Sequence, residues 1–277
     1  MNTADFKAHH MNISAEDVAG NNGVGRYILL PGSDGRAASI AEHFSNGWVK
    51  EHSRRHNFYA GTLDLEGEPV DVAVVATGMG CPSVDIIVNE LIRLGARRLL
   101  RVGTAGSLQP GRIPIGSIVV ASAAVRDEGA SRLYMPAEVP ALASPEMVAA
   151  ANRACEVCSV EYGFTGIVHT KDSLYARELR AGPRVEENKR FMEQLTSCGV
   201  LASEMETAML FTLAQVYSQE FRAAGEGLEV EAGTILGIIG DETAFGTEEQ
   251  AASTTELSVN VGLETIRQRA RVERAGS

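Results

Sequence analysis

Residues 99–110 read LLRVGTAGSLQP, in which a strand-like apolar run passes directly into a glycine turn with an arginine and a threonine. Residues 28–36 (ILLPGSDGR) have the same form with an arginine beyond the turn, and residues 72–83 (VAVVATGMGCPS) repeat it without one. Apolar strands that break into glycine turns are typical of α/β sheets, which bind small ligands at their strand ends. Glycine also serves such turns for conformational reasons alone. The glycine turns alone do not predict a ligand site; their combination with Arg36 and Arg101 predicts a site for an anion.

Strand-like runs recur along the chain, and helical patterns lie between several of them. This alternation predicts an α/β domain around a mixed sheet. We expect one domain over residues 1–277, with a partly irregular segment at 1–25, because no linker rich in Pro, Gly or Ser divides the chain. Residues 221–230, rich in Gly and Glu, are expected to form a surface loop. The expected strands are 27–30, 70–76, 98–102, 117–121, 166–169, 200–202 and 234–239, and the expected helices are 37–44, 83–94, 145–158, 185–198, 204–218 and 248–271.

Composition restricts the partners of the chain. A net charge of -11 and a pI near 5.1 argue against nucleic acid and anionic membranes, because both attract basic surfaces. Cys155 and Cys158 form a CxxC without a second pair at ligand spacing, so no metal site is predicted. With no signal peptide or bilayer-spanning run, we expect a cytoplasmic protein with reduced thiols. Neither a P-loop nor a strand-linked GxGxxG occurs, which argues against a nucleoside triphosphate or a dinucleotide as ligand.

Residues 203–207, SEMET, follow a short apolar run and open a helical pattern. Acidic residues also favour the first turn of a helix through its dipole, so a capping role is one interpretation. A carboxylate at a strand end is equally suited to accept hydrogen bonds from two adjacent sugar hydroxyls, with Met205 against the sugar. The arginines and this carboxylate together indicate a site for a phosphate and a ribose.

Five separated motifs, in this order, give the chain a family resemblance: LLPGSDGR, ATGMGCPS, LRVGTAGSLQP, KDSLYARELR and SEMET. The chain resembles the hexameric-type nucleoside phosphorylases, most closely the uridine phosphorylases, from about residue 10 to the last expected helix. The resemblance implies a single-domain, three-layer α/β sandwich whose mixed sheet forms a distorted central barrel. It also implies a pentosyltransferase that converts a ribonucleoside and phosphate to ribose 1-phosphate and free base, with uridine as the expected substrate.

The resemblance further implies roles for individual residues. It implies inorganic phosphate as a co-substrate, no cofactor and no assigned metal. A homodimer with shared sites is implied, whereas a hexamer is left open. Arg180 would draw charge from the departing base, and in the purine alternative Asp241 would protonate it. The implied phosphate ligands are Gly32, Arg36, Arg101, Thr104 and, from a partner subunit, Arg55 or its neighbour Arg54; the ribose ligands are Met205, Glu206 and the partner's His10; the base ligands are Gly106, Leu174, Glu178, Arg180 and Glu204.

Three departures from the uridine phosphorylase pattern keep a purine nucleoside open as the alternative substrate. Glu178 stands where that pattern has a glutamine, and an ionised carboxylate accepts hydrogen bonds but donates none. Leu174 replaces the stacking aromatic, and Gly240-Asp241-Glu242 replaces an asparagine-arginine pair. The long segment after Tyr175 favours the pyrimidine enzymes. A nucleosidase of the same fold or a non-catalytic nucleoside binder ranks lower, because the first needs no phosphate cluster and the second needs no complete site.

Overall fold

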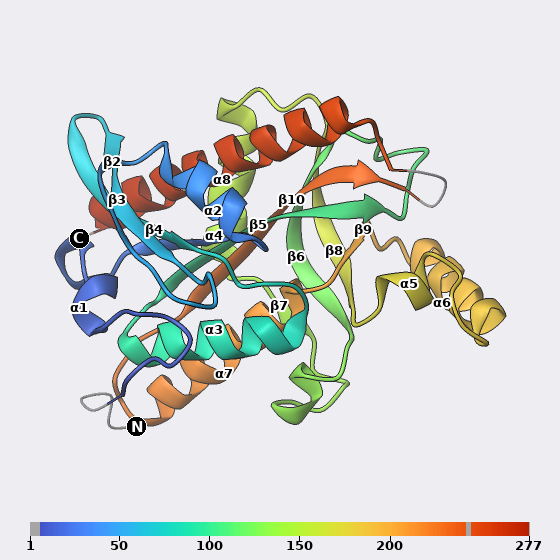
Figure 1. Cartoon of the computed structure of the whole chain (residues 1–277), viewed down its shortest axis with the longest axis horizontal. Helices are drawn as coiled ribbons and strands as arrows, with labels where there is room; N and C mark the ends of the chain where they lie inside the picture. Colours follow the sequence, from blue (N-terminus) through green and yellow to red (C-terminus); the bar gives the residue numbers. More distant parts are fainter. Residues whose placement is uncertain (1–5, 242–244, 277) are drawn as a thin grey trace.

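The computed structural model describes residues 6–241 and 245–276. Its strands are β1 (Tyr27–Leu30), β2 (Ser45–Lys50), β3 (Phe58–Leu65), β4 (Glu68–Val75), β5 (Arg98–Ser107), β6 (Ile118–Asp127), β7 (Ala141–Leu142), β8 (Gly163–Lys171), β9 (Ala202–Glu204) and β10 (Glu231–Gly240). Its α-helices are α1 (Ala15–Val18), α2 (Asp34–Ala41), α3 (Cys81–Leu94), α4 (Pro145–Val157), α5 (Leu174–Arg177), α6 (Val185–Ser197), α7 (Thr207–Ala223) and α8 (Glu248–Gly276). Figure 1 shows their arrangement.

Strand β5 is the branch point of the sheet. It pairs in parallel with β1 and β10 and, at its carboxyl end, antiparallel with β9. Strands β10, β6, β8, β9 and β5 close into a ring because β10 also pairs with β5, and β1, β4, β3 and β2 extend the sheet outward. The expected mixed sheet with a distorted central barrel is therefore confirmed.

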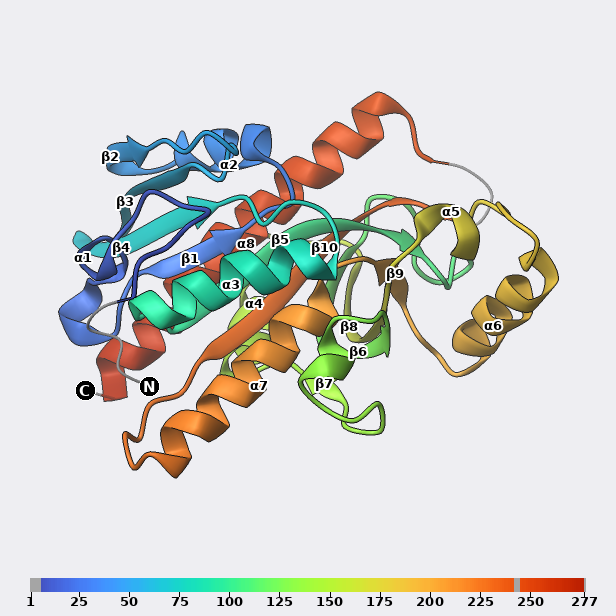
Figure 2. The same cartoon turned by 60° about the horizontal axis from the view of Figure 1, so that its bottom comes forward.

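The inner strands are buried on both faces, which explains their unbroken apolar sequence. Ile28 and Leu30 of β1 pack into the hydrophobic cluster that includes α3 and α7. Tyr27 and Leu29, which point the other way, pack into a second cluster with α2, α4 and α8. Figure 2 shows helices on the two sides of the sheet. Each such fully buried aliphatic side chain contributes about 1.5–3 kcal/mol of hydrophobic stabilisation.

Most of the expected elements are present, and the differences have local causes. Expected strands at 27–30 and 98–102 lie within β1 and β5. Helix α7 begins at Thr207 rather than Glu204, because Glu204 is the last residue of β9 and pairs with β8. The loop expected at 221–230 begins three residues later, since α7 continues to Ala223. Strands β2, β3 and β7 and the short helices α1 and α5 were not expected.

The N-terminal segment is anchored to the domain within the part that the structure describes. Met11 and Val18 are almost completely buried in the cluster beside α3. Residues 1–5 of the expected irregular segment lie outside the described residues. Among the described residues, no helix combines the length and the apolar character that are needed to span a bilayer.

Candidate active site

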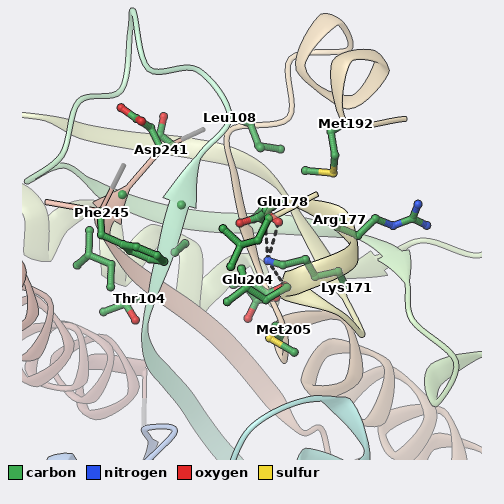
Figure 3. A pocket seen from close by; sticks show the side chains of 18 of the residues that line it. Thr104, Leu108, Lys171, Arg177, Glu178, Met192, Glu204, Met205, Asp241 and Phe245 are labelled. Atoms are coloured by element: carbon green, nitrogen blue, oxygen red, sulfur yellow. Dashed lines mark hydrogen bonds and ion pairs between the residues drawn. The ribbon is translucent and has the colours of Figure 1, made fainter. Parts of the chain in front are cut away.

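A cavity of about 860 Å³ opens at the carboxyl ends of β1, β5, β9 and β10 and is covered by α5 and α6. Figure 3 shows Glu178, Glu204, Asp241 and Phe245 around it. It brings together the residues that the sequence predicts for one subunit: Gly32, Arg36, Arg101, Thr104, Gly106, Leu174, Glu178, Arg180, Glu204, Met205, Glu206 and Asp241. His10 and Arg55, predicted to serve a partner subunit, do not line this cavity.

The guanidinium of Arg101 forms the floor of the cavity. Its Nε donates to Glu204 Oε2 at 3.1 Å and its Nη2 to Glu206 Oε2 at 2.5 Å. Its Nη1 is buried without a hydrogen-bond partner among the described residues. Gly103 leaves room for this arrangement, because a Cβ there would lie 2.8 Å from Arg101 Nη2. A buried donor without a protein partner is rare in folded proteins, and this one is available to an anionic ligand that enters the cavity.

Arg36 and Thr104 line the same cavity as Arg101. Arg36 follows the glycine turn after β1 and makes no ion pair within the described residues, and burial followed by the Arg101 cation lowers the pKa of its side chain. The half-buried Thr104 faces the same cavity from β5. Two guanidiniums close enough to repel each other cost free energy unless an anion lies between them. This cluster is therefore suited to a dianion such as phosphate.

The carboxylate oxygens of Glu204 are occupied by hydrogen bonds from the protein itself. Its oxygens accept hydrogen bonds from Thr170 Oγ1 at 2.6 Å and from the backbone N–H groups of Glu206 and Thr207 at 2.9–3.0 Å, besides Arg101. Burial opposes its charge, but Arg101 and these donors hold the pKa of Glu204 below its usual range. Glu204 thus caps the start of α7 and orients Arg101. Its assignment to base binding stays a prediction.

Glu206, for which the sequence predicts a role as ribose acceptor, lines the cavity. Its Oε1 accepts from the Gly80 N–H at 2.7 Å and its Oε2 from Arg101, which leaves further lone pairs for a ligand. Burial, together with the nearby Glu204 carboxylate, raises the pKa of Glu206 despite the attraction of Arg101. Met205 lines the cavity next to it. The geometry suits two adjacent hydroxyl groups that donate to one carboxylate.

Near Glu204, Glu178 meets Lys171, a lysine that no sequence motif marks as a site residue (Figure 3). Lys171 Nζ lies 2.7 Å from Glu178 Oε1, as the dashed lines in Figure 3 show, and the lysine side chain is 2% exposed. Lys171 also donates to Ser203 Oγ at 2.9 Å. A buried ammonium usually requires a carboxylate partner, so the ionised Glu178 faces the cavity as half of an ion pair.

Helix α5 is anchored on both sides, which fixes the position of Glu178 at its carboxyl end. Arg177 forms two contacts of 2.6–2.7 Å with the Asp127 carboxylate, and a third with Asn188 at 2.6 Å. Asp127 also contacts His169 Nε2 at 2.9 Å. Burial opposes the charge of Asp127, but His169 and Arg177 lower the pKa of this carboxyl.

Two further residues with predicted base-binding roles, Leu174 and Arg180, line the cavity, and those roles stay predictions. Arg180 lines the cavity with a left-handed backbone, φ +55°, and Leu174 lines it from α5. An aromatic side chain is nevertheless present, because Phe245 lines the cavity beside Asp241 (Figure 3). Phe245 was not predicted, because it lies far along the chain from position 174, where the family pattern has its stacking aromatic. Glu242 lies outside the described residues.

His10 lies away from this chain's cavity but is held in a defined orientation. Its Nδ1 contacts Glu90 Oε1 at 2.7 Å, and its backbone N–H donates to the same carboxylate. Glu90 also accepts from the His9 N–H, and although burial opposes its charge these donors lower the pKa of Glu90. With Nδ1 held by Glu90, the other ring nitrogen, Nε2, stays available for a contact with another group. Arg55 is exposed on a left-handed turn, φ +58°.

Comparisons with known proteins identify the family of the chain. Residues 26–225 match the model of the Phosphorylase superfamily. A uridine phosphorylase of Treponema pallidum is 36% identical over 94% of this chain and 93% of that protein, and one of Escherichia coli is 32% identical over 93% and 96%. A guanosine phosphorylase of Halorubrum lacusprofundi is 31% identical over 68% of this chain and 71% of that protein. The chain therefore belongs to the Phosphorylase superfamily.

Proposed function

We propose that the chain catalyses the reversible phosphorolysis of uridine, with inorganic phosphate as co-substrate and no further cofactor. The observation that carries this proposal is the buried, unpartnered Arg101 Nη1 next to the Glu206 carboxylate. One guanidinium thus adjoins both an anion site and a hydroxyl acceptor. Phosphorolysis needs that juxtaposition, because a phosphate oxygen attacks the anomeric carbon of the ribose.

The residues would divide the work along the cavity. Arg36 and Arg101 would hold phosphate, which takes the place of water as the nucleophile, while Glu206 would hold the ribose hydroxyls. The bond to the base breaks through an oxocarbenium-like state, so electrons pass to the base as it leaves. Arg180 would stabilise that charge at a base carbonyl. A nucleosidase of this fold would have no use for the two arginines.

Uridine is favoured over a purine nucleoside by two observations. The uridine phosphorylases named above match over more than nine-tenths of this chain, whereas the guanosine phosphorylase matches over 68%. The α5–α6 segment that carries Glu178 and Arg180 covers the base end of the cavity. One observation supports the purine alternative, since Asp241 lines the cavity where it would meet a leaving purine.

Initial rates with uridine, inosine and guanosine, each with and without phosphate, test the proposal. We expect phosphate-dependent release of uracil, with kcat/KM for uridine at least about tenfold above that for either purine nucleoside, a difference of about 1.4 kcal/mol. Faster release of hypoxanthine or guanine would transfer the function to the purine alternative and the proton donation to Asp241. Uracil release that is independent of phosphate would identify a nucleosidase.

We also propose that the chain acts as a single-domain homodimer in which His10 and Arg55 enter the partner's cavity. Neither residue lines the cavity of its own subunit, and the contact with Glu90 holds the His10 ring in one orientation. A symmetric dimer would supply each of two sites with both side chains. Cytoplasmic location stays a prediction.

Co-expression of an Arg55→Ala chain with a Glu206→Ala chain tests the shared site. Each variant alone is impaired in every site, but a mixed dimer contains one site with Glu206 from one chain and Arg55 from the other. Random pairing should therefore restore about a quarter of the wild-type activity. Co-expression of Arg54→Ala with Glu206→Ala serves as the comparison. It shows whether Arg54 or Arg55 is the arginine that crosses the dimer interface into the partner's cavity. Activity equal to the mean of the two parents would argue against sharing.

A further inference from the structure

The ion pair between Lys171 and Glu178 has a consequence for which base the cavity accepts. Glu178 Oε1 is buried and lies 2.7 Å from Lys171 Nζ; the two groups form an ion pair by distance, and Oε1 accepts no hydrogen bond from the described residues. Glu178 Oε2 has no hydrogen-bond partner among the described residues and lies 3.7 Å from where a Cβ on Gly106 would stand. Gly106 lines the cavity at the end of β5. One oxygen of the carboxylate is therefore taken by the protein, and the other is left for a ligand.

The position of this pair is fixed from both ends. Lys171 is the last residue of β8, and its ammonium is held by Ser203, whose hydroxyl also contacts His169 Nδ1 at 2.9 Å. Glu178 follows α5, which Arg177 ties to Asp127. Rotation of the carboxylate would break the ion pair, so its free oxygen keeps one direction. A preorganised acceptor of this kind discriminates between ligands by the donors that they present.

We propose that Lys171 is a specificity-determining residue that restricts Glu178 to a single acceptor and thereby selects a base with one ring N–H between two carbonyls. This inference rests on the proposed nucleoside phosphorolysis. Glycosylated uracil has that pattern, whereas guanine presents two adjacent donors, its ring N–H and its amino group, which suit both oxygens of an unpaired carboxylate. The Lys171 charge also offsets repulsion between Glu178 Oε1 and the carbonyl beside the ring N–H.

The same cavity contains a matched control pair. Lys189 and Glu193 of α6 line it as well, but their charged atoms are 3.8 Å apart and both side chains are more than half exposed. Lys189→Met removes the same charge from the same cavity without releasing a buried carboxylate oxygen. A general effect of charge on substrate binding would appear in both lysine variants, whereas control of Glu178 would appear in only one.

The test is the ratio of kcat/KM for guanosine to kcat/KM for uridine in wild type, Lys171→Met and Lys189→Met. We expect Lys171→Met to raise this ratio at least about tenfold, mainly through KM, and Lys189→Met to leave it within about twofold. Lys171→Arg, which keeps a cation beside Glu178, should restore much of the wild-type ratio. A ratio within a single variant does not depend on the fraction of enzyme that folds, so partial misfolding does not obscure the result.

An unchanged ratio in Lys171→Met, with both substrates reduced together, would overturn the inference and assign Lys171 a purely structural role. Glu178→Gln gives an independent check. The amide of this variant offers one acceptor oxygen even without the lysine, so Glu178→Gln alone should lower uridine turnover only a little. In the double variant with Lys171→Met, the guanosine turnover gained by Lys171→Met should be lost again. Failure of the proposed function is distinguishable, because it appears in the wild-type substrate preference and not in the change that Lys171→Met produces.

Discussion

Replacement of Glu206 with alanine is expected to lower kcat/KM for uridine by about 10²–10⁴-fold, because two hydrogen bonds to a charged carboxylate contribute about 1.5–3 kcal/mol each. The loss should exceed any loss of phosphate binding, since Arg36 and the unpartnered Nη1 of Arg101 remain. Arg101 loses its Nη2 partner but keeps Glu204 at 3.1 Å. Steady-state kinetics at saturating phosphate, together with the rise in Tm that phosphate causes, measure the two effects separately.

A substrate without the two ribose hydroxyls removes the same hydrogen bonds from the side of the ligand that Glu206→Ala removes from the side of the protein. 2′,3′-Dideoxyuridine should be as poor a substrate for wild type as uridine is for Glu206→Ala, and the combination should bring little further loss. Glu193→Ala removes an exposed carboxylate from the same cavity and should leave the rates unchanged. If dideoxyuridine lowers the rate of Glu206→Ala as much as that of wild type, the hydroxyls are recognised elsewhere.

The sheet could be predicted from sequence where its strands are buried on both faces. Strands β1 and β5 give continuous apolar runs, and each ends in a turn that the sequence marks with glycine. Strand β2 gives no such signal, because its six residues, SNGWVK, form an exposed edge with a register shift. Helix α5 is a single turn, which is too short for the 3.6-residue period to show.

The site could be predicted where one local motif carries both the chemistry and the turn. Arg101 and Glu206 were found in this way, and the structure places them in contact. Lys171 was not found, since nothing in a polar residue at a strand end signals burial. Its environment comes from Glu178 across a turn and from Ser203 on another strand. An ion pair formed by tertiary packing produces no characteristic residue spacing in the sequence. The role of Glu178 depends on such a pair, the one with Lys171.

Replacement of Arg101 with alanine is expected to have the second large effect, on stability and phosphate use together. It leaves Glu204 and Glu206 buried without their shared cation, which is expected to lower the free energy of unfolding by about 3–5 kcal/mol. The phosphate-induced rise in Tm should largely disappear, and the KM for phosphate should rise at least about 10²-fold. Arg101→Lys should recover stability more than phosphate binding, because an ammonium lacks the planar fork that serves two carboxylates and an anion at once.

Arg36→Ala separates the two consequences. Arg36 makes no ion pair within the described residues, so its loss should weaken phosphate binding while the thermal unfolding of the phosphate-free protein stays almost unchanged. Arg101 thus serves both the fold and the ligand, whereas Arg36 serves the ligand alone. Thermal unfolding of both variants across a phosphate titration tests this difference. A normal phosphate-induced rise in Tm for Arg101→Ala would show that its free Nη1 is not the anion donor, and would remove the observation on which the proposed function rests.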